Sequence, residues 1–116
     1  MKAAAVGGGI KAVFVIDSEG REVGTAVSEI SRHFKELKDR FRVVVVVPRH
    51  EAWLCIGLGF DAARCRNSPE HVLSMERGRY EKRHLAEWVR EIDVERLMWE
   101  GDFIDYVAAL RWLSDP

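Results

Sequence analysis

Residues 42–49, RVVVVVPR, contain the strongest strand signal in the chain. Its five consecutive valines are β-branched. An uninterrupted run of this kind is typical of a strand covered on both faces of a parallel sheet. Pro48 lacks the N–H that a continuing strand would need, so the strand is expected to end there. A shorter apolar run at Val13–Ile16 predicts a second buried strand.

The segment between these runs predicts a helix over residues 25–40. Its apolar residues recur at spacings of three and four, which places them on one face of a helix. Residues 13–47 are therefore expected to form a strand–helix–strand unit with parallel strands and a right-handed crossover. Residues 3–6 are a candidate third strand, and residues 1–11 are otherwise expected to be a flexible or edge segment.

The rest of the chain predicts short helices. Four tryptophans fall at apolar helical positions and are expected in the core or at an interface. The sequence thus predicts one α/β domain over residues 1–116, with a small parallel sheet, flanking helices and a helical C-terminal half. The residues that mark the expected helix starts are Glu51, Ser68 with Pro69, His84, Asp93 and Asp102.

The composition excludes a general polycation. The net charge is −1, so any affinity for nucleic acid must come from a local basic patch. Glycines and Lys11 interrupt the apolar N-terminal segment, which is too short to span a membrane. No small-residue cleavage site follows it, as a secretion signal would require. We therefore expect a cytoplasmic protein without a membrane partner.

The chain has two cysteines, Cys55 and Cys65. Scarce amide side chains together with abundant charge are typical of thermophile proteins, in which intracellular disulfides do occur. Two free thiols are nevertheless the favoured interpretation. The pair lacks the C-x-x-C spacing of a zinc site.

Charged side chains follow both predicted strands. Asp17 and Glu19 come directly after the first strand, and Arg49, His50 and Glu51 come after the second. Because parallel strands end at the same edge of a sheet, these side chains are expected around one crevice. Hard oxygen ligands of this kind suit Mg²⁺. The alternative is that the acids form turns or favour the start of the next helix, and that His50 is an ordinary surface residue.

Residues 76–84, ERGRYEKRH, are a second candidate site. Arg79, Lys82 and Arg83 lie around Tyr80, and basic residues interleaved with an aromatic ring suit a phosphate backbone and a stacked base. The alternative is a solvated helix junction whose charge is balanced by nearby glutamates.

Four blocks of the sequence resemble TOPRIM-like proteins, in the small prokaryotic branch often encoded beside ABC-type or OLD-type ATPases. The resemblance implies a doubly wound α/β fold and Mg²⁺ chemistry on nucleic-acid phosphodiesters. It also implies that Asp17 and Glu19 hold the metal, that Glu51 is a third ligand or a weak catalytic base, and that an ATPase is a partner. The matching blocks are VFVIDSEG, VVVVVPRHEAWL with its Glu-x-Trp-Leu element, the segment containing Tyr80-Glu81-Lys82 and Ile92-Asp93, and DFIDYVAALRWL.

Two departures from the TOPRIM pattern affect the expected activity. The first strand of such domains, with its acid–base glutamate, has no counterpart here, and the second acid of the pair is Glu19 rather than aspartate. We therefore expect a protein that binds Mg²⁺ and a nucleic-acid or nucleotide phosphate through Arg49, His50, Arg79, Lys82 and Arg83. If active, it would be a degenerate nuclease or phosphodiesterase. The alternative is a non-catalytic interaction or oligomerisation subunit, whose narrow sheet is covered in a homo-oligomer.

Overall fold

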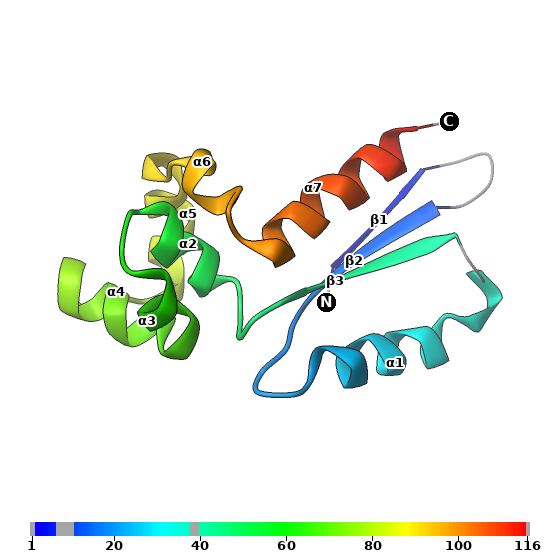
Figure 1. Ribbon diagram of the computed structural model, residues 1–116, viewed down its shortest axis with the longest axis horizontal. Helices are drawn as coiled ribbons and strands as arrows, with labels where there is room; N and C mark the ends of the chain where they lie inside the picture. Colours follow the sequence, from blue (N-terminus) through cyan, green and yellow to red (C-terminus); the bar gives the residue numbers. More distant parts are fainter. Residues whose placement is uncertain (1, 7–10, 38–39, 116) are drawn as a thin grey trace.

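The computed structural model describes residues 2–6, 11–37 and 40–115. It has a three-stranded sheet with a helix on each face and a helical lobe at one end (Figure 1). β2 and β3 are parallel, as the sequence predicts, and α1 (Val23–His33) connects them. The strands lie in the order β1 (Lys2–Val6), β2 (Lys11–Asp17) and β3 (Phe41–Val46).

β1 occupies the segment expected to form a third strand, but it pairs antiparallel with β2. The sheet is therefore mixed: the β2–β3 pair is parallel, as predicted, and β1 adds an antiparallel edge strand, for which the sequence predicted no direction. The reason for the antiparallel pairing is the length of the connection, because residues 7–10 alone separate β1 from β2. A parallel connection needs a crossover of about a dozen residues or more. Residues 7–10 themselves lie outside the described part of the chain.

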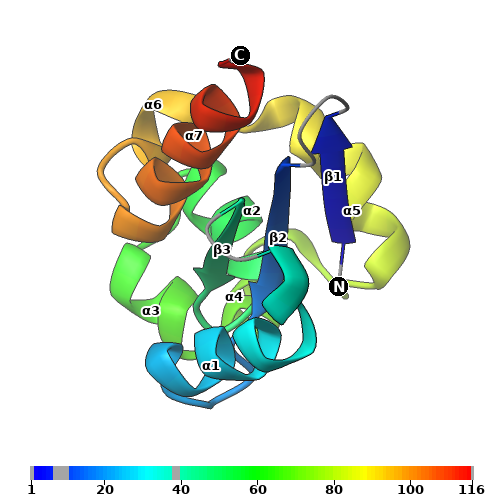
Figure 2. The same ribbon diagram turned by 90° about the vertical axis from the view of Figure 1, so that its right-hand side faces the viewer.

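α1 packs on one face of the sheet (Figure 2). Ile30 of α1 and Phe14 of β2 belong to the core cluster between the two elements. The helix ends at His33, earlier than expected, and a single 3-10 turn, η1 (Lys35–Leu37), follows. Phe34 leaves the helix at this point and its ring lies 4.5 Å from that of Phe14. Phe34 thus contacts Phe14 in the core, and α1 does not continue beyond His33.

α7 (Gly101–Ser114) packs on the opposite face of the sheet. Ala109 of α7 is buried together with Val13 and Val44 of the sheet. Phe14 faces α1 while its neighbour Val13 faces α7, as the two-residue period of a strand requires. Within the described residues, no helix is long and apolar enough to cross a lipid bilayer.

The helical lobe follows β3 and lies beyond its carboxyl end (Figure 1). Ser68 and Pro69 start α4, and the Asp93 carboxylate accepts a hydrogen bond from the Glu95 N–H at the start of α6, as expected. The lobe consists of α2 (Glu51–Gly57), α3 (Ala62–Asn67), α4 (Pro69–Arg77), α5 (Lys82–Trp88), the 3-10 turn η2 (Val89–Glu91) and α6 (Val94–Leu97).

A disulfide joins Cys55 of α2 to Cys65 of α3, so the preference for two free thiols is wrong. Both residues are fully buried, and their Cα atoms lie 5.7 Å apart. The sequence does not show this pairing because the turn between the helices brings them together. Gly59 lies in that turn and has a φ of +101°. Residues other than glycine rarely adopt this backbone conformation.

The prediction that Asp102 caps α7 is also wrong, because the N-cap is Glu100 and Asp102 lies in the first turn. Its carboxylate instead accepts hydrogen bonds from Arg66 Nη1 at 2.5 Å and Nη2 at 2.7 Å. It also accepts from Trp53 Nε1 at 3.0 Å and from the Val47 N–H at 3.2 Å. Asp102 therefore ties α7 to the helical lobe and to the end of β3.

Candidate charged site at the carboxyl edge of the sheet

The parallel register of β2 and β3 brings the two strand ends to one edge. Asp17, the last residue of β2, pairs with Val46, the last residue of β3. The turn after β2 is held against the segment after β3, because the Glu19 N–H donates to the Pro48 carbonyl at 3.0 Å. Glu19 takes a positive φ of 52° in this turn. The acids after β2 and the charged residues after β3 are thus neighbours.

Asp17 is engaged by His50. Its Oδ1 accepts a hydrogen bond from the His50 backbone N–H at 3.0 Å and also contacts His50 Nδ1. The Asp17 side chain is 21% exposed and that of His50 is 46% exposed. Asp17 therefore fixes the chain entering α2, and its charge faces an imidazole.

Arg49 connects Glu19 to Glu70, the latter on α4. Arg49 Nη2 lies 3.1 Å from Glu19 Oε2, and Nη1 lies 2.6 Å from Glu70 Oε1. The third donor atom, Nε, is buried and has no hydrogen-bond partner among the described residues. Arg49 is thus directed at two carboxylates from different parts of the chain.

Glu51, in the first turn of α2, is almost completely buried, with a side chain 2% exposed. Its Oε2 accepts hydrogen bonds from Lys82 Nζ at 2.9 Å and from the Tyr80 hydroxyl at 3.2 Å. Its Oε1 is buried without a partner in the described part of the chain. The Glu-x-Trp-Leu and Tyr-x-Lys elements of the sequence therefore meet at one carboxylate.

The electrostatic environment keeps Glu51 charged. Burial acts to raise the pKa of Glu51, but the hydrogen bond from Lys82, the backbone and Tyr80 together hold it below its ordinary value. Burial and the Glu51 charge raise the pKa of Tyr80, so the phenol stays protonated and donates. The hydrogen bond to Glu51 likewise raises the pKa of Lys82.

The oxygen donors have the chemistry that Mg²⁺ prefers, but their arrangement does not suit it. Asp17, Glu19 and Glu51 each face a different partner. Among the described residues, no group of three histidine, cysteine or acidic side chains is placed to hold a metal ion. A catalytic role for Glu51 stays a prediction from the sequence. The metal site remains a prediction from the sequence.

The second candidate site lies at the junction of α4 and α5. Arg79 and Arg83 both lie beside Glu81, with Nε–Oε distances of 3.6 Å and 3.0 Å. Their side chains are 88% and 73% exposed, and that of Lys82 is 79% exposed. Two guanidinium groups that share one carboxylate leave a local positive charge. Lys82 links this junction to Glu51.

One partner in these sites, Glu70, was not predicted from the sequence, and the contact made by a second, Tyr80, differs from the predicted one. Glu70 lies on α4 and is brought to Arg49 by the packing of the lobe. Tyr80 was considered for base stacking, yet its hydroxyl donates to Glu51. The sequence signal for the contact between Tyr80 and Glu51 was the Tyr80-x-Lys82 spacing, because both residues belong to one block of the TOPRIM-like resemblance. Nothing in the local sequence marks Glu70.

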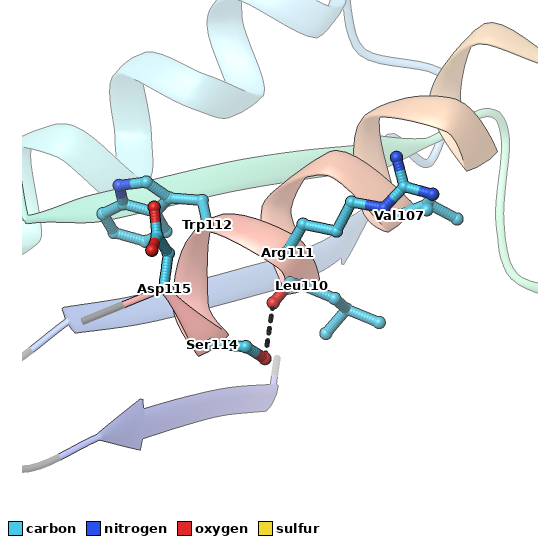
Figure 3. Close-up of a pocket in the computed structure, with 6 residues that line it drawn as sticks. All are labelled: Val107, Leu110, Arg111, Trp112, Ser114 and Asp115. Atoms are coloured by element: carbon cyan, nitrogen blue, oxygen red, sulfur yellow. Dashed lines mark hydrogen bonds between the residues drawn. The ribbon is translucent and has the colours of Figure 1, made fainter.

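A separate hollow of about 640 Å³ lies along the C-terminal turns of α7 (Figure 3). Its lining includes Leu110, Arg111 and Trp112, and Ser114 Oγ donates to the Leu110 carbonyl at 3.0 Å. None of the candidate site residues lines it. This hollow therefore adds no group to the charged edge.

Comparisons with known proteins found no matching family model, no matching curated protein and no matching solved structure.

Proposed function

We propose that this protein is a non-catalytic interaction subunit built on a TOPRIM-like scaffold. One observation carries the proposal: each of the three candidate metal ligands is already engaged by a partner side chain. Asp17 faces His50, Glu19 faces Arg49, and Glu51 accepts from Lys82 and Tyr80. A metal-dependent hydrolase needs these carboxylates to converge on one ion, with an open position for substrate.

In this proposal the charged edge has a structural role. Asp17 and Glu19 hold the chain between β3 and α2, while Glu51 ties α2 to the α4–α5 junction through Lys82. The contacts fix the position of the helical lobe on the sheet. A scaffold of fixed geometry binds a partner at a lower entropic cost than a flexible one.

An exposed apolar patch at the α6–α7 junction supports a binding role. Trp99 is 87% exposed, and its neighbours Val94 and Met98 are 50% and 42% exposed. Trp99 does not belong to the core of the described chain. Exposed tryptophan and methionine side chains are enriched at protein–protein interfaces. Homo-oligomerisation and docking on an ATPase partner remain predictions for this surface.

Calorimetric titration with Mg²⁺ and Mn²⁺, on wild type and Asp17→Asn side by side, tests the proposal. We expect no binding at sub-millimolar concentrations in either protein and no metal-dependent cleavage of single- or double-stranded DNA. We also expect Asp17→Asn to destabilise the fold by about 0.5–1.5 kcal/mol, because it removes the charge from the bond to His50. Urea denaturation measures this loss.

The opposite pattern would replace this function with a metal-dependent one. Sub-millimolar binding that disappears in Asp17→Asn, with stability unchanged or raised, would identify Asp17 as a ligand in a cluster of mutually repelling carboxylates. Ser28→Ala is a suitable control, because Ser28 is exposed on α1 and lies away from the charged edge.

Phosphate binding is the second candidate function, and the α4–α5 junction favours it. Arg79, Lys82 and Arg83 are largely exposed there, and the two arginines share Glu81. Binding of a labelled oligonucleotide that weakens with added salt, and weakens further in Arg79→Ala/Arg83→Ala, would support this function. Binding unchanged in that variant would exclude the junction as the site.

A further inference from the structure

A groove of about 680 Å³ lies between the helical lobe and the sheet. Val13 and Val15 of β2 line it, and Leu85 of α5 and Leu110 of α7 line it from the two neighbouring helices. Val89 and Leu110, two of its lining residues, are 44% and 38% exposed. The groove is thus an apolar surface open to solvent, formed by elements far apart in the sequence.

Most of the side chains that line the groove are apolar, and a few polar side chains complete the lining. Its side chains are apolar apart from the polar groups of Trp53, Tyr106, His50 and Lys82, and no carboxylate of the described residues lines it. Ligand sites typically have volumes of about 300–1,000 Å³, with apolar walls and a few polar groups that set the orientation. The lining fits that description, and the charged groups facing the groove are basic.

Both basic groups retain hydrogen-bonding capacity for a ligand. Lys82 Nζ donates to Glu51, yet an ammonium has three N–H donors and the Lys82 side chain is 79% exposed. His50 contacts Asp17 through Nδ1, which leaves Nε2 without a partner in the described chain. Because Asp17, Glu51 and Glu70 also act on the Lys82 ammonium, an anionic group would be held here by the N–H donors that Lys82 keeps free, and not by an excess of positive charge.

The size of the groove favours a small ligand over a helix of another protein. A helix with side chains is about 10 Å across and rises about 5.4 Å per turn, which corresponds to roughly 420 Å³ per turn. The groove volume of about 680 Å³ equals less than two such turns. Helical partners usually anchor through side chains spread over two turns or more.

We propose that the groove binds a single-chain aliphatic carboxylate. The alkyl chain lies against Val13, Val15, Leu85 and Leu110, where burial of each further methylene should tighten binding about fourfold. The carboxylate accepts hydrogen bonds from the Lys82 N–H groups that do not donate to Glu51. This proposal uses no metal and does not depend on the function proposed above.

Calorimetry with three probes tests the proposed ligand class. Sodium dodecanoate is expected to bind with one-to-one stoichiometry, and butanoate, which has the head group without the long chain, is expected to show no binding. Dodecyltrimethylammonium has the same chain with the opposite charge, and we expect it to bind at least about tenfold more weakly.

A pair of matched variants locates the site. Ala86 is exposed on α5 and lines the groove, so Ala86→Phe fills the groove while it leaves Lys82 and His50 in the chain. We expect this change to weaken dodecanoate binding at least about tenfold. Ala63→Phe places the same side chain at an exposed position of α3 outside the lining and is expected to leave binding unchanged. Lys82 is unsuitable for the first test, because its removal leaves Glu51 buried without its cation.

Three results would overturn the proposal. The first is no binding of dodecanoate by folded wild type up to about 1 mM, an affinity of only about −4 kcal/mol. The second is equal affinity for the anionic and cationic probes, which would exclude recognition of charge. The third is self-association of the wild type that Ala86→Phe abolishes, which would assign the groove to a second copy of the chain.

Discussion

Glu51 and Asp102 are a buried and a partly buried carboxylate that the fold treats differently. Their side chains are 2% and 12% exposed, and each faces a basic residue from another element, Lys82 or Arg66. Both oxygens of Asp102 accept hydrogen bonds, and those donors come from three residues. Glu51 accepts through one oxygen, and its other oxygen is buried without a partner in the described chain.

The difference separates a carboxylate whose two oxygens are both hydrogen-bonded from one whose second oxygen is left without a partner in the described chain. A buried acceptor without a partner costs about 1–3 kcal/mol relative to one that is satisfied. Asp102 avoids this cost, and the cation facing it is itself half-buried, with 23% of the Arg66 side chain exposed. Glu51 bears the cost beside a lysine that is mostly in water. Asp102 therefore makes the stronger stabilising contact. The sequence around neither carboxylate indicates this difference.

Replacing Asp102 has the largest expected effect. Asp102→Ala removes the acceptor for Trp53 Nε1 and two of the hydrogen bonds of Arg66, whose guanidinium keeps Glu100 and the Val47 carbonyl as acceptors. Breaking a buried ion pair at one partner costs about 3–5 kcal/mol, and we expect a loss in this range from urea denaturation. Asp105→Ala, at an exposed position of the same helix, is the control and should change stability by less than about 0.5 kcal/mol. Equal losses in the two variants would show that the Arg66 contact is not stabilising.

Replacing Glu51 with its neutral isostere should have a smaller effect. Glu51→Gln retains an acceptor for Tyr80 and removes the buried charge, while Lys82 returns to water. An ion pair with so exposed a partner contributes about 0–1 kcal/mol, so the variant should lie within about 1 kcal/mol of wild type in either direction. A loss as large as that of Asp102→Ala would contradict the comparison and make Glu51 an equal structural contact.

The response to acid should be the smallest of the three effects. Burial acts to raise the pKa of Glu51 and of Asp102, but their hydrogen-bond donors hold both below their ordinary values of 4.5 and 3.8. A carboxyl whose folded pKa is lowered contributes stability above its unfolded pKa, and this stability is lost as the pH falls through the folded value. Wild type should therefore lose stability below about pH 4.5, when urea midpoints are compared from about pH 6 to pH 3.

The Glu51→Gln variant separates the two contributions to that acid response. It lacks the Glu51 titration and retains that of Asp102, so its stability should fall less steeply with decreasing pH than that of wild type. A steeper fall in the variant would mean that Glu51 is more easily protonated in the folded state than in the unfolded state. The sign of its pKa shift would then be wrong.

Local patterns predicted the elements better than their ends or their partners. The valine run and the Val13–Ile16 run became β3 and β2, and Ser68 and Asp93 precede helices as expected. The antiparallel direction of β1 follows from its short connection to β2, whereas the sequence predictions gave this candidate strand no direction. Asp102 fitted a helix start equally well as a cap or as a first-turn residue, and only the position of Arg66 distinguishes the two.

The charged edge was likewise predictable only in part. That Asp17, Glu19 and Arg49 meet was predictable, because parallel strands deliver their carboxyl ends to one edge. Which partner each acid selects was not predictable, because Glu70 and Lys82 come from helices whose positions depend on packing of the whole lobe. The same charged residues can form either a set of metal ligands or a set of ion pairs. The two arrangements differ only in the directions in which the side chains point.

The sequence by itself determined the strand–helix–strand unit and the edge at which its charges gather, because hydrophobic periodicity and chain connectivity are local properties. Tertiary structure alone decided the Cys55–Cys65 disulfide, the pairing of Glu51 with Tyr80 and Lys82, and the apolar groove beside them. Each of these depends on bringing distant segments to within a few ångströms of one another. That proximity arises from burial of the two core layers and the lobe together, which no single stretch of the chain encodes.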